Sequence, residues 1–124
     1  MKKVFAVMLL FLPFVQASAQ IRTDGCYQSE VITVEGLDWY GYFYFYQDGS
    51  ACYEIDMKGN HPPNPCTGIF GAGNYEMKGN TVHITLTDSD NKFRSYDGTI
   101  SQNQLKVHST DAGSPEEIYN FIKH

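Results

Sequence analysis

Apolar and polar side chains alternate along most of the chain after residue 25, as expected for β-strands with one buried face. The alternation is clearest in Thr81–Thr87, where every second side chain is apolar. Turn-forming sequences such as Asp48-Gly49 separate the alternating segments. The pattern predicts eight short strands: Cys26–Val34, Tyr40–Tyr46, Ala51–Met57, Asn74–Lys78, Thr81–Thr87, Phe93–Ile100, Leu105–His108 and Ile118–Lys123.

These strands favour an all-β fold. Short connections between consecutive strands indicate an antiparallel meander, which closes into a small barrel or, alternatively, folds into a β-sandwich. No segment has the pattern of a helix that would connect parallel strands. The segment His61–Pro65 contains three prolines, which lack the amide hydrogen that a central strand needs, so we expect a long loop there.

The first 19 residues predict a cleavable secretory signal peptide. Lys2 and Lys3 precede the uncharged apolar run Val4–Val15, and small residues follow at Ala17-Ser18-Ala19. The apolar run is shorter than the about 20 residues that a membrane-spanning helix requires. We therefore expect cleavage between Ala19 and Gln20, a mature domain of residues 20–124, and a periplasmic or secreted location in a bacterium.

Cleavage changes the charge of the domain. Lys2 and Lys3 would leave with the signal peptide, so the formal net charge would go from −5 to −7. This acidity argues against binding to nucleic acid or to an anionic membrane surface. The mature sequence is also rich in Tyr, Thr, Ile and Val, which favour strands.

The aromatic segment Tyr40–Tyr46 places its tyrosines on one face and Phe43 and Phe45 on the other. A two-residue turn at Asp48-Gly49 would pair Tyr46 with Ala51 and turn the tyrosines toward the core. A three-residue turn that begins at Gln47, with a left-handed Gly49, would shift the pairing by one residue.

We favour the three-residue turn, because it buries the two phenylalanines and leaves the phenol hydroxyls near water or polar partners. The tyrosines would then lie beside Cys52, Glu54 and Asp56. Because a slip of one residue exchanges the two faces of a strand, this turn decides whether the chain displays a tyrosine surface.

The three cysteines allow one disulfide in an exported protein. Cys52–Cys66 would close the shortest loop, and Cys26–Cys66 is the alternative. The histidines, among them His83 and His108 at outward positions, lack metal-site spacing, so we expect no metal and no cofactor. No catalytic motif is present, and we expect a protein that is not an enzyme.

The predicted meander resembles the small lipocalin-like, calycin-type barrels of secreted bacterial proteins. Gly25-Cys26-Tyr27 is similar to their G-x-W start with Tyr in place of Trp, Tyr44–Ser50 is similar to their aromatic strand and D-G turn, and Ile118–Lys123 is similar to their closing strand. The resemblance implies an apolar pocket for a small ligand.

We therefore expect a small exported binding protein that holds an apolar or amphipathic ligand inside a barrel. The alternative is a protein-interaction module, such as an inhibitor of an exported enzyme, that uses the Tyr40–Tyr46 face and the proline-rich loop. Candidate binding residues are Tyr42, Phe43, Tyr44, Phe45, Tyr46, Tyr53 and Ile55, with Val82, Ile84 and Leu86 as further lining residues. The same interior side chains would fill a solid core if the barrel is not hollow.

Overall fold

The computed structural model describes residues 20–57 and 70–123, and this part of the chain contains only strands, turns and connections. In these ranges no helix has the length and hydropathy needed to cross a membrane. The strands are β1 (Gly25–Ser29), β2 (Ile32–Val34), β3 (Leu37–Phe45), β4 (Ser50–Met57), β5 (Gly71–Lys78), β6 (Thr81–Asp88), β7 (Phe93–Ser101), β8 (Gln104–Ser109) and β9 (Glu117–Lys123).

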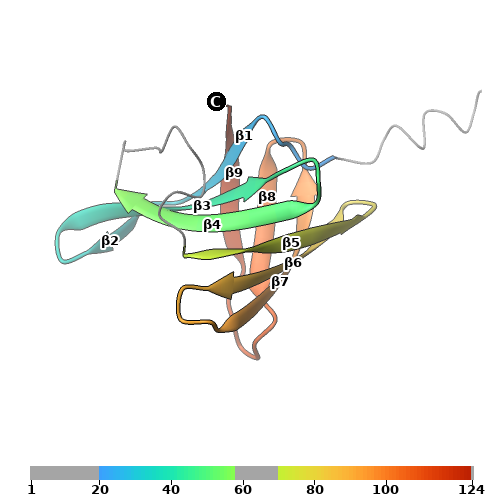
Figure 1. The fold of residues 1–124 in the computed structure, drawn as a ribbon. Coiled ribbons are helices and arrows are strands. Elements are labelled where there is room, and N and C mark those ends of the chain that lie inside the picture. Colours follow the sequence, from blue (N-terminus) through green and yellow to red (C-terminus); the bar gives the residue numbers. More distant parts are fainter. Residues whose placement is uncertain (1–19, 58–69, 124) are drawn as a thin grey trace, which may run out of the picture.

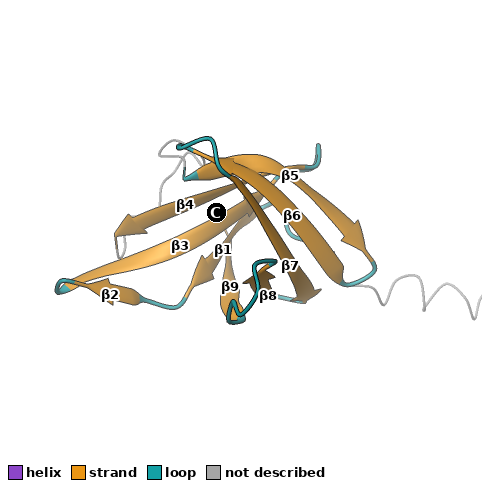
Figure 2. Ribbon diagram, turned by 90° about the horizontal axis from the view of Figure 1, so that it is seen from below, coloured by secondary structure: helices purple, strands orange, loops and turns teal. Residues whose placement is uncertain are grey.

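The strands form a closed antiparallel barrel, which confirms the predicted fold class and the barrel rather than the sandwich. Neighbouring strands follow the chain from β3 to β9, and β1 closes the barrel because it pairs with both β9 and β3. Eight strands make the barrel, and β2 is an additional strand at the edge of β3. Figures 1 and 2 show β2 and the adjoining part of β3 projecting away from the barrel.

The turn between β3 and β4 is the three-residue turn favoured above. Tyr46 N–H donates to the Ser50 carbonyl, and Gly49 has a left-handed φ of 90°. The strands pair with Phe45 opposite Ala51 and Tyr44 opposite Cys52. This register sends the phenylalanines into the barrel and the tyrosines to its outer face, as predicted.

The predicted first strand, Cys26–Val34, is wrong in one respect, because a bulge divides it into β1 and β2. Gln28 pairs with Tyr42 and Ile32 pairs with Trp39, so four steps along one strand match three along the other. The Ser29 hydroxyl accepts the Gly41 N–H at the irregular position, at 2.8 Å. The bend directs residues 30–39 away from the barrel as a hairpin, which we call the arm.

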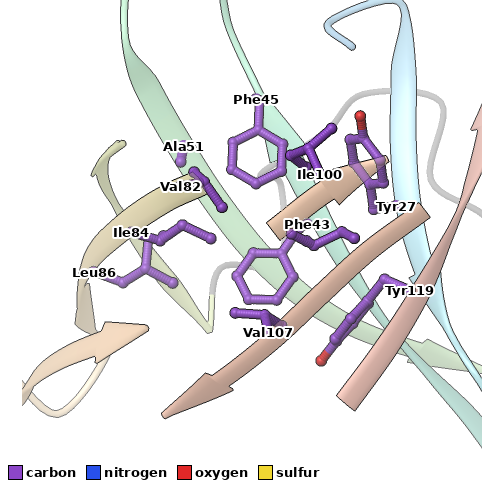
Figure 3. Packing of buried hydrophobic residues seen from close by; sticks show 11 residues of the cluster. Tyr27, Phe43, Phe45, Ala51, Val82, Ile84, Leu86, Ile100, Val107 and Tyr119 are labelled. Atoms are coloured by element: carbon purple, nitrogen blue, oxygen red, sulfur yellow. The ribbon is translucent and has the colours of Figure 1, made fainter. Parts of the chain in front are cut away.

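Buried side chains fill the centre of the barrel (Figure 3), and the partly buried Tyr75 and Met77 of β5 pack against them. The Phe43 ring lies 4.6 Å from the Tyr53 ring and 5.0 Å from the Tyr119 ring, between centroids. Fully buried aliphatic side chains from the opposite wall complete this core. It comprises Tyr27, Phe43, Phe45, Ala51, Val82, Ile84, Leu86, Ile100, Leu105, Val107 and Tyr119.

A second buried cluster lies on the outer face of the barrel, and it corrects one expectation. Tyr42 and Tyr44 are each 1% exposed, packed with Cys26 and Cys52. The register therefore places the phenols outside the barrel wall, as predicted, but it does not display these two to water. A surface platform formed by all the tyrosines of Tyr40–Tyr46 is consequently wrong.

One end of the barrel is closed by the residues that precede β1. Arg22 N–H donates to the Tyr27 hydroxyl at 2.9 Å, and the Arg22 guanidinium lies 4.0 Å from the centre of the Phe121 ring. The same guanidinium donates to Asp24 and Asn103. Together with Ile21, which packs against the core, these residues cover the end at which β9 finishes.

Three predictions fall outside the described residues: the signal peptide in residues 1–19, the loop at His61–Pro65, and the cysteine at position 66. The Cys26 thiol is buried and takes no part in a disulfide. The alternative Cys26–Cys66 pairing is therefore wrong, and the Cys52–Cys66 pairing stays a prediction.

Candidate functional site

Two cavities meet at the end of the barrel where β4 finishes and β9 begins, which we call the mouth. The wider cavity, of about 300 Å³, lies against the arm and includes Ile32, and the narrower one, of about 210 Å³, lies under the connection before β9 and includes Pro115. Tyr53, Glu117 and Tyr119 line both cavities. A pair of adjacent cavities with a few converging polar groups is typical of a small-ligand site.

Two tyrosine hydroxyls and one carboxylate form a hydrogen-bonded series where the two cavities meet. The Tyr119 hydroxyl donates to the Glu117 carboxylate at 2.9 Å, and the Tyr53 hydroxyl lies 3.3 Å from the Tyr119 hydroxyl. Tyr119 is 2% exposed, whereas Glu117 is exposed. This hydrogen-bonded series therefore links the barrel core to solvent, and it offers a buried polar group to the polar end of a ligand.

Burial controls the acidity of these phenols. It raises the pKa of Tyr53 to about 12, and the hydrogen bond with Tyr119 partly opposes this shift. Burial also raises the pKa values of Tyr119 and Tyr96, and the negative charge of Glu117 adds to both shifts. All three hydroxyls are consequently protonated at neutral pH. Tyr119 already donates its proton to Glu117, and Tyr53 donates to the Tyr119 oxygen, so these two phenols offer a ligand acceptor oxygens.

The arm extends the apolar interior beyond the barrel wall. Trp39 pairs with Ile32 on one side and with Met57 on the other, so these three side chains share one face. Trp39 and Phe43 are four positions apart on β3, so their side chains point to the same side of the strand, and this face is continuous with the barrel interior. Ile32 is 45% exposed and lines the wider cavity, which makes the arm one wall of the mouth.

The structure separates the predicted binding residues into three groups. Phe43 and Tyr53 line the mouth cavities, and Ile55 is partly buried on the same face of β4. The others lie away from the mouth cavities: Phe45, Val82, Ile84 and Leu86 belong to the central core, Tyr42 and Tyr44 belong to the outer cluster, and Tyr46 is half-buried beside that cluster.

Sequence reasoning missed Ile32, Tyr96, Glu117 and Tyr119 as site residues. Two of them follow from period-two alternation, because Tyr96 and Tyr119 fall on inward positions of their strands. Ile32 and Glu117 carry no such signal, since their roles depend on the bulge after β1 and on the path of the connection before β9.

A separate groove lies on the outer face of β5 to β8. Glu76 pairs with His83, His83 with Asp97, and Asp97 with His108, which forms a row of titratable side chains across four strands. The His83 Nδ1 lies 2.6 Å from the Asp97 carboxylate. Nevertheless, no group of three or more His, Cys, Asp or Glu side chains within residues 20–57 and 70–123 is arranged to hold a metal ion.

Comparisons of the chain with models of protein families, with curated proteins and with solved structures find no match. The barrel is therefore established by the structure itself, and the resemblance to lipocalin-like proteins stays a prediction.

Proposed function

We propose that the chain is an exported small binding protein that holds an amphipathic ligand in the mouth of its barrel. The observation that carries this proposal is the continuity of the barrel interior with the arm, at the place where two cavities surround the Tyr53 and Tyr119 hydroxyls. The apolar part of the ligand would lie against Ile32 and the ring of Phe43. Its polar end would meet the phenols.

This site is shallower than a pocket that fills the whole barrel. Aromatic and aliphatic side chains occupy the centre, and the Arg22 contacts close the opposite end. The ligand would therefore enter and leave through the mouth without opening the core. The proposed role is binding, and the buried phenol oxygens would act as hydrogen-bond acceptors without taking part in chemical conversion.

Binding can be tested with N-phenyl-1-naphthylamine, a neutral dye whose fluorescence rises in apolar sites. We expect saturable binding to the wild-type protein and a clear loss for Ile32→Ser, because Ile32 lines the wider cavity. Val34→Ser is the matched control, since Val34 is on the same face of β2 but lines neither mouth cavity. An equal response of both variants, or no saturable binding, would contradict the proposal.

The export part of the proposal rests on the sequence of residues 1–19. Expression of the full chain in a Gram-negative host, followed by mass spectrometry of the periplasmic fraction, tests it directly. We expect a mature protein that begins at Gln20 and lacks the apolar segment. An intact chain in the cytoplasm would contradict export.

A second candidate function is protein interaction through the arm. Val34 is 53% exposed and Leu37 is 46% exposed, and neither lines a mouth cavity. Exposed apolar side chains in a group are typical of a contact surface. If this function holds, Leu37→Ser will prevent association with an exported partner while dye binding in the mouth persists.

A further inference from the structure

The carboxylates that line the mouth are its main charged side chains, and His108 is the one other titratable side chain besides the tyrosines among the described residues that line it. Glu30 lines the wider cavity, Glu117 lines both cavities, and within the described ranges no Lys or Arg lines either one. Glu116 also lines the wider cavity, but it faces the outer groove as well, where Lys106 is present. The negative charge of the mouth therefore rests mainly on Glu30 and Glu117.

The charge of Glu117 acts on the interior of the mouth as well as on its rim. Its carboxylate accepts the hydrogen bond from Tyr119, and its charge adds to the effect of burial in raising the pKa values of the phenols at Tyr53 and Tyr119. At Tyr96 the opposite effect of the Arg94 charge on the pKa is larger than that of Glu117. An anionic group in the mouth would meet the same field and would be repelled, whereas a cation would be attracted.

Aromatic rings surround the same position. Phe43, Tyr53, Tyr96 and Tyr119 all line the narrower cavity, and the Phe43 ring contacts the rings of the other three. The faces of aromatic rings attract cations, and rings together with a carboxylate are the usual elements of ammonium recognition. Arg94 interacts with the Tyr96 hydroxyl and also donates to Asp88 at 2.8 Å, so its charge is shared with a carboxylate.

We infer that the ligand of the mouth is a cationic amphiphile, an alkyl or aryl ammonium compound with an apolar tail. Its ammonium group lies among the phenol rings and beside Glu117, and its tail lies in the wider cavity, along Ile32. This inference rests on the proposed function, because it names the ligand class of the same site. On this inference, contacts with the apolar walls provide most of the binding affinity, and Glu117 provides the preference for a cationic ligand.

Three probes that each contain an eight-carbon chain test the inference: octyltrimethylammonium, 1-octanol and octanoate. Each probe competes with N-phenyl-1-naphthylamine for the wild-type protein at low ionic strength. We expect octyltrimethylammonium to bind at least about tenfold more tightly than octanoate, with octanol between them. Salt should reduce this preference, because it screens the charge of Glu117 at the exposed rim.

The variant Glu117→Gln should bring the affinity for octyltrimethylammonium close to the affinity of the same variant for octanol. Glu76→Gln is the matched control, because it removes the same charge from the outer groove. Glu30→Gln, at an exposed position just after β1, serves as a second mouth variant if Glu117→Gln lowers the melting temperature.

The outcomes separate the two claims. If all three probes bind with equal affinity, the ligand class is wrong and the proposed function stands. If neither the dye nor any probe binds, the proposed function itself is wrong. A cation preference that survives in both mouth variants would overturn the assignment of the ammonium position to these carboxylates.

Discussion

Gly41 leaves the space that the Tyr53 hydroxyl occupies: a Cβ atom at position 41 would stand 2.0 Å from that oxygen. The glycine lies on the inner face of β3, between Trp39 and Phe43 and opposite Ile55. Gly41→Ala should therefore displace the Tyr53 ring and separate its hydroxyl from Tyr119. We expect a loss of about 1–3 kcal/mol in the free energy of unfolding, as for other overpacked cores, measured by urea denaturation.

The double variant Gly41→Ala with Tyr53→Phe is the control for this mechanism, because it deletes the oxygen that the new methyl group would strike. We expect it to recover part of the lost stability. If the two substitutions are additive, the close approach of Gly41 and Tyr53 is not the cause of the loss.

The burial of Tyr44 gives a second prediction. Its side chain is 1% exposed and its ring lies 6.3 Å from that of Tyr42, between centroids, in the outer cluster. Tyr44→Ala should cost about 3–5 kcal/mol of stability, as for other large buried aromatics. The half-buried Tyr46 provides the comparison, and Tyr46→Ala should cost clearly less. Equal and small losses in thermal unfolding would mean that Tyr44 belongs to a surface.

Alkaline pH should destabilise the fold. Burial raises the pKa of the Cys26 thiol from 9.0 to about 12, and that of the Tyr53 hydroxyl from 10.0 to about 12. Above about pH 9 the unfolded chain therefore releases protons that the folded chain keeps, so these groups stabilise the fold below that pH and their contribution is lost as pH rises toward 12. The melting temperature should fall steadily between about pH 9 and pH 11. A constant melting temperature across this interval would disagree.

The turn after β3 sets which face of the aromatic strand is buried. Gly49 has a φ of 90° and a Cβ at this position would have nothing within 4 Å, so the cost of a side chain there is conformational rather than steric crowding. Gly49→Ala should lose about 1–2 kcal/mol, and Gly49→Asn should lose less, because Asn enters the left-handed region more readily. Thermal unfolding distinguishes the two, and identical losses would argue against this backbone origin.

The sequence predicts most of the barrel because strand alternation and turn residues are local signals. The register of β3 and β4 follows from three residues at the turn, and it correctly places Phe43 and Phe45 inside. The boundary between β1 and β2 was not predictable in this way, since Ile32 and Val34 continue an acceptable strand pattern. Only the pairing with β3 reveals the extra residue.

The site was predictable only in part, for a related reason. Tyr53 and Phe43 could be assigned to the interior from their parity, but alternation does not say which interior residues fill the centre and which line an open end. The Tyr53–Tyr119 contact joins residues 66 positions apart and depends on closure of the barrel. The burial of Tyr42 and Tyr44 could not be predicted from the alternation either, because alternation assumes that one face of the strand is exposed and both faces are covered there.

The most direct test of the central claim is an amide NMR titration of the protein with octyltrimethylammonium, which reports where a ligand binds. We expect saturable shift changes concentrated at the mouth, in Ile32, Tyr53 and Tyr119, with little change at the closed end around Tyr27. Ile32→Ser should weaken the response, and Val34→Ser should preserve it. The absence of saturable changes, or changes centred on the outer groove at His83, would contradict binding in the mouth of the barrel.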